Sequence, residues 1–324
     1  MKKPQALYTE IIGGFEHKKV LLIGDVILDV YVYGKALGIS SETPTIVAEE
    51  LRTDVSFGGS SLVARNLLEL GASVTFIAVL GLDGEAKLYN GFSHEKLTTR
   101  FIIDKTRRTT AKKRFWIDGY KLLQLDRLDN RDIGAGVARS VIAGIKTAIR
   151  DCDAVIISDN RHGMMTDGLI KETGRLVRRS RVPSFVDSQV SQRESNILKY
   201  RDFSFICLNI EEAKQIDPDF TGEGTFERLE RKLGKANICV KLGDKGSVAS
   251  IGGRLIRTPA VKAKAVDTCG AGDAFLSALS LGDFEHPAES LFIANVWAGL
   301  SVTRHGINPP EKKELLRYIG NLKD

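Results

Sequence analysis

The sequence has few cysteines and no long apolar segment, and each absence excludes a class of protein. Four cysteines occur in 324 residues, without the closely spaced pairs of a zinc motif. We therefore expect reduced, buried thiols instead of metal ligands, with Cys207 and Cys239 inside apolar runs. Apolar runs such as residues 74–80 are far shorter than the ~20 residues that cross a bilayer, which excludes a membrane-spanning helix.

Neither the charge nor the N-terminus points to nucleic acid or to secretion. Lys and Arg number 47 against 41 Asp and Glu, and the net charge of +6 suits an anionic small molecule or a weak interaction with a polyanion without by itself indicating nucleic acid. Residues 1–5 are basic, but no continuous apolar stretch follows them, so we expect no secretory signal and a cytoplasmic protein. With 43% hydrophobic and 27% charged residues, the composition is typical of a soluble globular protein.

Short apolar runs alternate with segments of helical periodicity along most of the chain. Because helical crossovers join parallel strands, this alternation predicts an α/β fold whose mostly parallel sheet is covered on both faces. No linker or internal repeat is visible, so residues 1–324 are expected to form one domain. The strands are expected at 18–24, 74–80, 154–158, 183–187, 204–208 and 237–242, and the helices at 60–70, 134–150, 166–179, 270–281 and 288–303.

Two regions depart from this alternation. Residues 43–57 and 98–127 alternate as strands do, with no helix inside them, so we expect them to pair as an antiparallel sheet that projects from the α/β body. Together with the chain from about residue 30, they are expected to form a small β lid inserted after the first strand.

The segment from Asp267 to Phe275 carries the strongest chemical signal. Gly270, Ala271 and Gly272 are small residues at a predicted helix start, where free N–H groups and the helix dipole favour anionic oxygens. Asp273 follows within the first turn, where its carboxylate can take a proton from an alcohol while the amides hold a phosphoryl group. The alternative is a helix cap in which the glycines serve packing alone.

Two motifs resemble those of a known family. Residues 267–273 read D-T-C-G-A-G-D and are similar to the D-T-x-G-A-G-D signature of the ribokinase-like (PfkB) sugar kinases. A second signature is similar at residues 57–67, and the likeness extends over about residues 18–308. Residues 24–29, 39–44 and 112–114 look most like the heptose 7-phosphate kinases. The resemblance implies a ribokinase-like three-layer sandwich and an ATP-dependent sugar kinase.

The resemblance also implies roles around ATP and Mg²⁺. Asp273 matches the catalytic base, and residues 270–272 match the anion hole. Asn209 and Glu212 match an N-x-x-E motif that organises magnesium and phosphate largely through water, although an Asn and a Glu after a strand can also be a helix cap. The remaining matches are to the nucleotide and its loop: Lys241, Gly243, Asp244, Gly246 and Asn295.

Further matches concern the acceptor and a monovalent cation. Asp25 and Asp29 match acids that accept hydrogen bonds from sugar hydroxyls, and Gly58 with Gly59 lets a ring approach the main chain, although two acids four residues apart can also be solvated charges. A loop that holds potassium in many relatives resembles Asp267, the Cys269 carbonyl and the later segment 301–306, with its occupancy left open. The residues assigned in that later segment are Ser301, Arg304 and Gly306.

A basic cluster at residues 105–114 supports a phosphorylated acceptor without reference to any family. Strand periodicity places Arg108, Thr110, Lys112 and Arg114 on one side, where arginine forks and lysine charges suit phosphate oxygens. The alternative is a solvated, basic edge strand. Nucleic acid is disfavoured because the nearby aromatic residues follow the cluster without alternating with it.

The acceptor pocket departs from the heptose kinase pattern. Leu62 stands where those kinases usually have Asn, which removes one amide contact to the sugar. His162 lies in another altered segment and is interpreted as a structural or surface residue in preference to an acid, base or metal ligand.

The sequence thus predicts an ATP-dependent kinase of a phosphorylated sugar, with heptose 7-phosphate preferred. A kinase of an unphosphorylated sugar or nucleoside and a catalytically silent sugar-phosphate sensor remain as alternatives. The chain ends about where the kinase should, so nucleotidyltransferase activity is expected from another protein. A homodimer through the lid is compatible with the alternating apolar set Ile46, Ala48, Val55 and Phe57.

Overall fold

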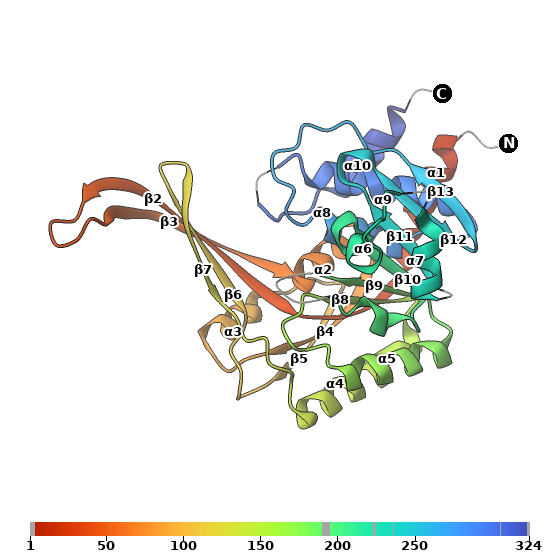
Figure 1. Ribbon diagram of the computed structural model, residues 1–324, viewed down its shortest axis with the longest axis horizontal. Helices are drawn as coiled ribbons and strands as arrows, with labels where there is room; N and C mark the ends of the chain where they lie inside the picture. The colour runs from red at the N-terminus through yellow and green to blue at the C-terminus, as the bar shows by residue number, and fades with distance from the viewer. Residues whose placement is uncertain (1–3, 190–194, 223–224, 235, 305, 323–324) are drawn as a thin grey trace.

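The largest element of the computed structural model, which describes residues 4–189, 195–222, 225–234, 236–304 and 306–322, is a nine-stranded sheet (Figure 1). Seven of its strands run parallel to their neighbours: β5, β4, β1, β8, β9, β10 and β11. Strands β12 and β13 add an antiparallel hairpin next to β11. Their order is β13 (Arg254–Thr258), β12 (Ser247–Ile251), β11 (Asn237–Lys241), β10 (Phe205–Asn209), β9 (Ser184–Ser188), β8 (Ala154–Asp159), β1 (Lys19–Gly24), β4 (Ser73–Leu80) and β5 (Leu97–Ile103).

Helices cover both faces of this sheet because its strands are apolar on both sides. Val20 and Leu22 of β1 belong to one buried cluster, and Leu21 and Ile23 belong to another. The expected three-layer sandwich is therefore confirmed. The first cluster includes α1 (Pro4–Gly14), α2 (Ser60–Glu69), α3 (Gly84–Leu88), α8 (Ala271–Ser280), α9 (Pro287–Ser301) and α10 (Lys312–Gly320); the second includes α4 (Ala135–Ala148), α5 (Asp167–Ser180), α6 (Ile210–Ile216) and α7 (Phe226–Leu233).

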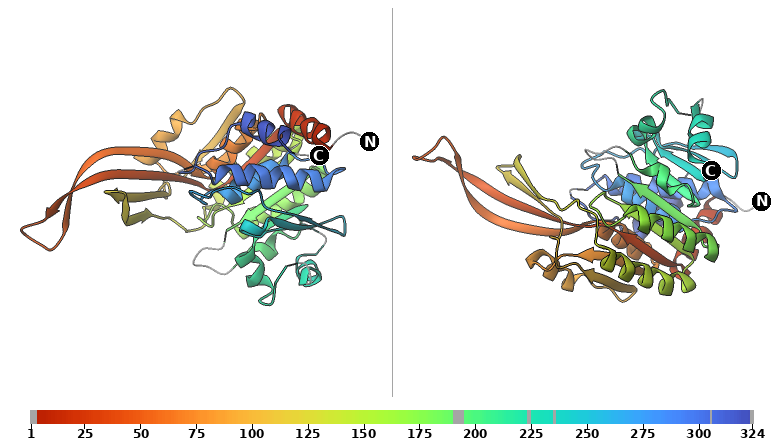
Figure 2. Two further views of the ribbon diagram at one scale, coloured as in Figure 1. Left: turned by 90° about the horizontal axis from the view of Figure 1, so that it is seen from above. Right: turned by 60° about the horizontal axis from the view of Figure 1, so that its bottom comes forward.

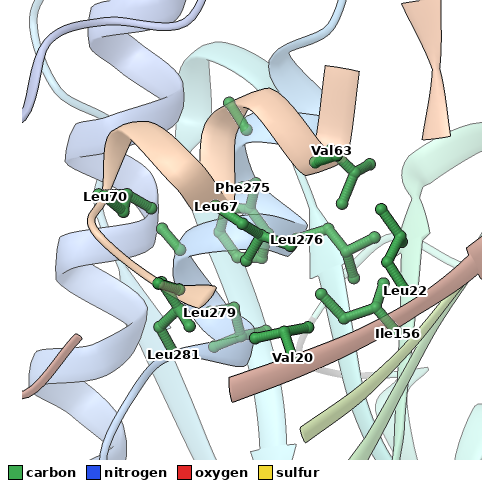
Figure 3. Close-up of a cluster of buried hydrophobic side chains, with 14 of the residues drawn as sticks. Val20, Leu22, Val63, Leu67, Leu70, Ile156, Phe275, Leu276, Leu279 and Leu281 are labelled. Atoms are coloured by element: carbon green, nitrogen blue, oxygen red, sulfur yellow. The ribbon is translucent and has the colours of Figure 1, made fainter. Parts of the chain in front are cut away.

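Helices α2 and α8 pack against each other over the same part of the sheet. Figure 3 shows Val63 and Leu67 of α2 beside Leu276 and Leu279 of α8, above the sheet residue Val20. This apolar contact fixes the two helices relative to one another and to β1. It brings the first turn of α2 against the start of α8.

The lid is a second sheet that projects from the body (Figures 1 and 2). Its order is β3 (Ile46–Gly59), β2 (Val26–Ile39), β6 (Ala111–Ile117) and β7 (Tyr120–Arg127). The expectation of a purely antiparallel lid is wrong, because β6 runs parallel to β2. Residues 98–103 were also placed wrongly in the lid: they belong to β5, which extends the main sheet through a parallel register with β4.

The register of the lid separates a polar face from an apolar face. Asp29 is aligned with Ser56 and Lys112, and Tyr31 is aligned with Asp54 and Arg114. The alternate positions carry apolar side chains on the opposite face, among them Val30, Val55, Val32 and Phe115.

The structure also tests the expectations about the cysteines and about membrane-spanning helices. Cys207 and Cys239 are buried in neighbouring strands, as expected, but Cys269 is exposed in the turn before α8, where no apolar strand encloses it. No helix within the described ranges is long and apolar enough to cross a membrane.

Candidate active site

Polar residues gather where the parallel strands of the main sheet end. Asp25 directly follows β1, Asp187 lies near the end of β9, Asn209 ends β10 and Lys241 ends β11. Because the carboxyl ends of parallel strands meet at one edge of a sheet, these residues gather there, and Asp187, Asn209 and Lys241 line one crevice with the start of α8.

A cavity of 550 Å³ occupies part of this crevice. Sequence reasoning assigned most of its polar lining but omitted Asp187, because an Asp at a strand end carries no distinctive signal by itself. Asp244, which was assigned to the nucleotide loop, is exposed and does not line the cavity. The assigned residues that do line it are Asn209, Glu212, Lys241, Gly243, Gly246, Gly270, Ala271, Gly272, Asp273 and Asn295.

The start of α8 forms one wall of the cavity. Gly270 is the N-cap residue with φ of 81°, a left-handed conformation that favours glycine. Asp273 lies in the first turn, and burial raises the pKa of its carboxyl to about 7. Asp187 and Asp29 raise this pKa further, whereas Lys241 lowers it. The carboxyl is thus poised to exchange a proton near neutral pH.

Lys241 and Asp187 form an ion pair inside the cavity. The Nζ atom lies 2.5 Å from Oδ2, and the two side chains are only 15% and 11% exposed. Burial lowers the pKa of Lys241, but Asp187 and Glu212 outweigh that effect and raise it overall. The ammonium is therefore charged at every physiological pH.

Asn209 and Glu212 form a reciprocal cap at the start of α6. The Glu212 backbone N–H donates to Asn209 Oδ1 at 2.9 Å, and the Asn209 backbone N–H donates to Glu212 Oε2 at 2.7 Å. The helix cap that competed with a magnesium role is thus present, and both residues also line the cavity. Carboxylate and amide oxygens suit a hard cation such as magnesium, so capping and outer-shell contact are compatible.

The polar face of the lid lies near the start of α8. Arg114 Nη1 forms an ion pair with Asp29 Oδ1, and both side chains are largely buried. Loss of water around the Cys269 thiol raises its pKa even though much of the residue is exposed, and Asp29 raises that pKa further. The Asp29 carboxylate also occupies the space where a Cβ on Gly58 would stand.

Asp25 is buried beneath the crevice. Its carboxylate accepts the backbone N–H groups of His162 and Met164, each at 3.2 Å. Burial raises its pKa to about 7, and Asp159 adds to the rise. Gly59, with φ of 58°, lies against the Asp25 carbonyl, which leaves no room for a side chain. These contacts show Asp25 supporting the main chain around it.

His162 is a structural residue, as expected. Its Nδ1 atom hydrogen-bonds Asn130 Oδ1 at 2.7 Å, and burial lowers the pKa of the ring to about 4. The imidazole is therefore neutral at physiological pH.

The basic cluster is smaller than the sequence indicated. β6 begins at Ala111, so strand alternation does not extend to Arg108, which precedes it in a loop. Arg107 donates to the carbonyls of Asp129 and His162 and thereby holds loops together. Lys112 and Arg114 remain on the polar lid face.

The segments assigned to a monovalent cation do come together. The Val266 N–H donates to the Val302 carbonyl at 2.7 Å, and the Asp267 carboxylate accepts the Gly306 N–H at 3.3 Å. The Asp267 carboxylate also accepts the Cys269 N–H at 3.0 Å.

Two of the assigned side chains point elsewhere. Ser301 Oγ donates to the Ala298 carbonyl, and the Arg304 guanidinium pairs with both oxygens of Glu314. A cation here would rely on the Asp267 carboxylate and main-chain carbonyls. Within the described residues, no group of three or more His, Cys, Asp or Glu side chains could hold a metal ion.

This fold and this crevice define a ribokinase-like α/β protein. A ribokinase from Arabidopsis thaliana, solved with ribose and ATP, is similar in structure, with a TM-score of 0.71, 20% identity and coverage of 93% of this chain and 98% of that one. Phosphofructokinase-2 from Escherichia coli, solved with potassium, is similar with a TM-score of 0.76, 15% identity and coverage of 94% and 99%.

The sequence comparisons agree with this fold. Residues 156–314 match the pfkB family carbohydrate kinase model. Bifunctional protein HldE of Nitratiruptor sp. is 28% identical over 94% of this chain and 66% of its own length, and HldE of Trichlorobacter lovleyi is 29% identical over 93% and 62%. The chain thus spans 62–66% of these relatives. The structural neighbours confirm the expected ribokinase-like fold, and the match to the pfkB model supports the expected enzyme class, an ATP-dependent carbohydrate kinase.

Proposed function

We propose that this chain transfers the γ-phosphoryl group of ATP to a hydroxyl of a phosphorylated sugar, with heptose 7-phosphate the preferred acceptor. The observation that carries the kinase proposal is Asp273, which is half-buried in the first turn of α8 and lines the cavity beside Gly270, Ala271 and Gly272. The heptose preference is supported by the similarity to the HldE proteins and by the lid cations Lys112 and Arg114.

The chemistry assigns one step to each group. The acceptor oxygen forms a bond to the γ-phosphorus, and the bond from that phosphorus to the β–γ bridging oxygen breaks, so that ADP leaves with the electron pair. Asp273 accepts the hydroxyl proton, and the first-turn amides of α8 stabilise the charge on the phosphoryl oxygens.

Magnesium, when bound, would neutralise charge on the nucleotide phosphates. Asn209 and Glu212 would act on it through water, since each already caps α6. Gly243 and Gly246 border the cavity where the nucleotide would lie, and both have positive φ that permits the tight turn.

A panel of acceptors tests the proposal. Purified protein is incubated with ATP, magnesium and, in turn, free sugars, nucleosides and sugar phosphates including heptose 7-phosphate, and ADP release is followed. Turnover only with phosphorylated sugars supports the proposal. Equal turnover of free and phosphorylated acceptors favours the alternative kinase, and no acceptor-dependent ADP release with any of them favours the silent sensor.

The Asp273→Asn variant tests whether Asp273 acts as the catalytic base without being needed for ATP binding. The variant should fold, bind ATP and lose turnover by about 10²- to 10⁴-fold, the usual contribution of a general base. Turnover above a few per cent of wild type would remove Asp273 from this role.

Three finer assignments belong to the same proposal. We assign the protein to the cytoplasm. Potassium would bind the loop of Asp267 and lower KM or raise kcat when added. A homodimer would use the apolar lid face, where Val55, Leu123 and Leu125 are exposed; Phe57, by contrast, packs against the body beside Tyr89. Sedimentation equilibrium of the wild type and Leu125→Lys tests the dimer.

A further inference from the structure

The ammonium of Lys241 lies where the transferred phosphoryl group is expected. Among the described residues that line the cavity, Lys241 is the cationic one. Its Nζ atom lies 3.2 Å from the position that a Cβ on Gly272 would occupy, so the absence of a side chain there makes room for the ammonium. The charge and the first-turn amides of α8 therefore border the same small volume.

Asp187 reaches Lys241 across an intervening strand. β10 lies between β9 and β11, and Asp187, Cys207 and Cys239 are aligned across the three strands. Both cysteines are buried, so the side chains that lie next to the ion pair on this sheet are small and weakly polar. Because both charged side chains are also largely buried, this environment strengthens the attraction between Lys241 and Asp187.

The ion pair has no clear value for stability alone. Removing two charges from water costs several kcal/mol per ion, which the mutual attraction only roughly offsets. A lysine ammonium is, however, a compact charge that suits phosphate oxygens, and a group aimed beforehand at developing charge needs little reorganisation. The placement at the start of α8 is thus the informative feature.

We propose that Lys241 binds the γ-phosphoryl group during transfer and that Asp187 is a positioning residue, which holds the ammonium at the start of α8 until the nucleotide arrives. This inference rests on the proposed kinase function. Without Asp187 the ammonium would turn toward Glu212, another carboxylate that acts on it. The triphosphate would then lose a contact that a diphosphate never makes.

Lys241 and Asp187 also shift the pKa of Asp273, the proposed catalytic base. The charged groups that act on Asp273 are Asp187 and Asp29, which raise its pKa, and Lys241, which lowers it. Lys241→Met should therefore move the acidic limb of the pH–rate profile to higher pH, and Asp187→Asn should move it to lower pH. If Lys241 and Asp187 served only to stabilise the fold, the two changes would not move the acidic limb in opposite directions.

The test compares nucleotide binding in Lys241→Met, Asp187→Asn and the double variant. Isothermal titration with a non-hydrolysable ATP analogue and with ADP needs no acceptor. We expect wild type to prefer the triphosphate, Lys241→Met to lose at least tenfold of that preference with ADP affinity kept, and Asp187→Asn to lose part of it. In the Lys241→Met background, Asp187→Asn should change the preference no further, because its effect passes through Lys241.

Controls keep the outcomes distinct. Lys199→Met and Asp167→Asn remove an exposed ion pair of the same residue types and should leave the preference unchanged. The double variant removes both charges of the pair, so neither is left without its partner, and thermal unfolding should show the protein folded. Additive effects of the two single changes, or an unaltered preference in Lys241→Met, would overturn the inference alone. A wild type that binds neither nucleotide would overturn the proposed function with it.

Discussion

A methyl carbon of Leu62 lies 2.5 Å from the position that a Cβ atom on Gly270 would occupy. The first turn of α2 therefore closes over the N-cap of α8, and the two helices leave space for a hydrogen atom only. Leu62 is buried, and the residue that follows it, Val63, belongs to the core that holds both helices in place. The anion site at α8 thus depends on the packing of α2.

Gly270→Ala should abolish most activity. The added methyl group would meet Leu62, and φ of 81° disfavours any side chain, so the start of α8 must move. We expect kcat to fall by 10²-fold or more, in the range of losing one anion-hole donor. The control is Gly136→Ala in α4, whose Cβ would lie 3.9 Å from Arg139 Nη2 and should leave kcat unchanged. Wild-type kcat in Gly270→Ala would argue against this anion site.

Activity should fall as the pH drops through about 7. Burial, helped by Asp187 and Asp29, raises the pKa of Asp273 to about 7, and protonation removes the base. The measurement is kcat/KM for ATP from pH 5 to 9 at saturating acceptor. An exposed aspartate would give a limb near pH 4. A flat profile down to pH 5 would contradict the assignment.

Asp273→Asn should stabilise the protein at high pH. Since the folded-state pKa is raised, the native carboxyl holds its proton better than the unfolded chain does. That stabilisation is complete below about pH 4 and is lost as the pH rises through about 7. Replacement by Asn should therefore raise Tm by about 2 °C or more at pH 8, with a smaller effect at pH 5. Exposed Asp132→Asn is the control, and equal effects at both pH values would contradict the burial argument.

Lys112→Ala should weaken binding of a phosphorylated acceptor. Lys112 lies on the polar lid face beside Asp29, whereas Lys113 lies on the opposite face beside Val30. We expect KM for the sugar phosphate to rise about tenfold, the effect of losing about 1.4 kcal/mol, with kcat nearly unchanged. Lys113→Ala should change neither value. Equal effects of the two changes would indicate general charge attraction instead of a contact.

The elements that the sequence placed well have strong local signals. The helix start at Gly270 and the helix expected at residues 60–70 both follow from glycine and apolar periodicity, and α8 and α2 begin there. β5 was assigned to the wrong sheet because alternation marks a strand without naming its partner. Arg108 was assigned to a strand face because the start of β6 has no sequence signal.

The sequence by itself determined the α/β order, the small-residue turn before Asp273 and the chemistry available at each strand end. Only the tertiary structure decided which charges meet. Asp187 and Lys241 are 54 residues apart and come together across β10, and Asp29 and Arg114 are 85 residues apart and meet through the parallel pairing of β2 with β6. The physical reason is that a pattern of residues specifies local conformation, whereas burial and pairing between distant segments set the pKa of each charge and the partner it finds.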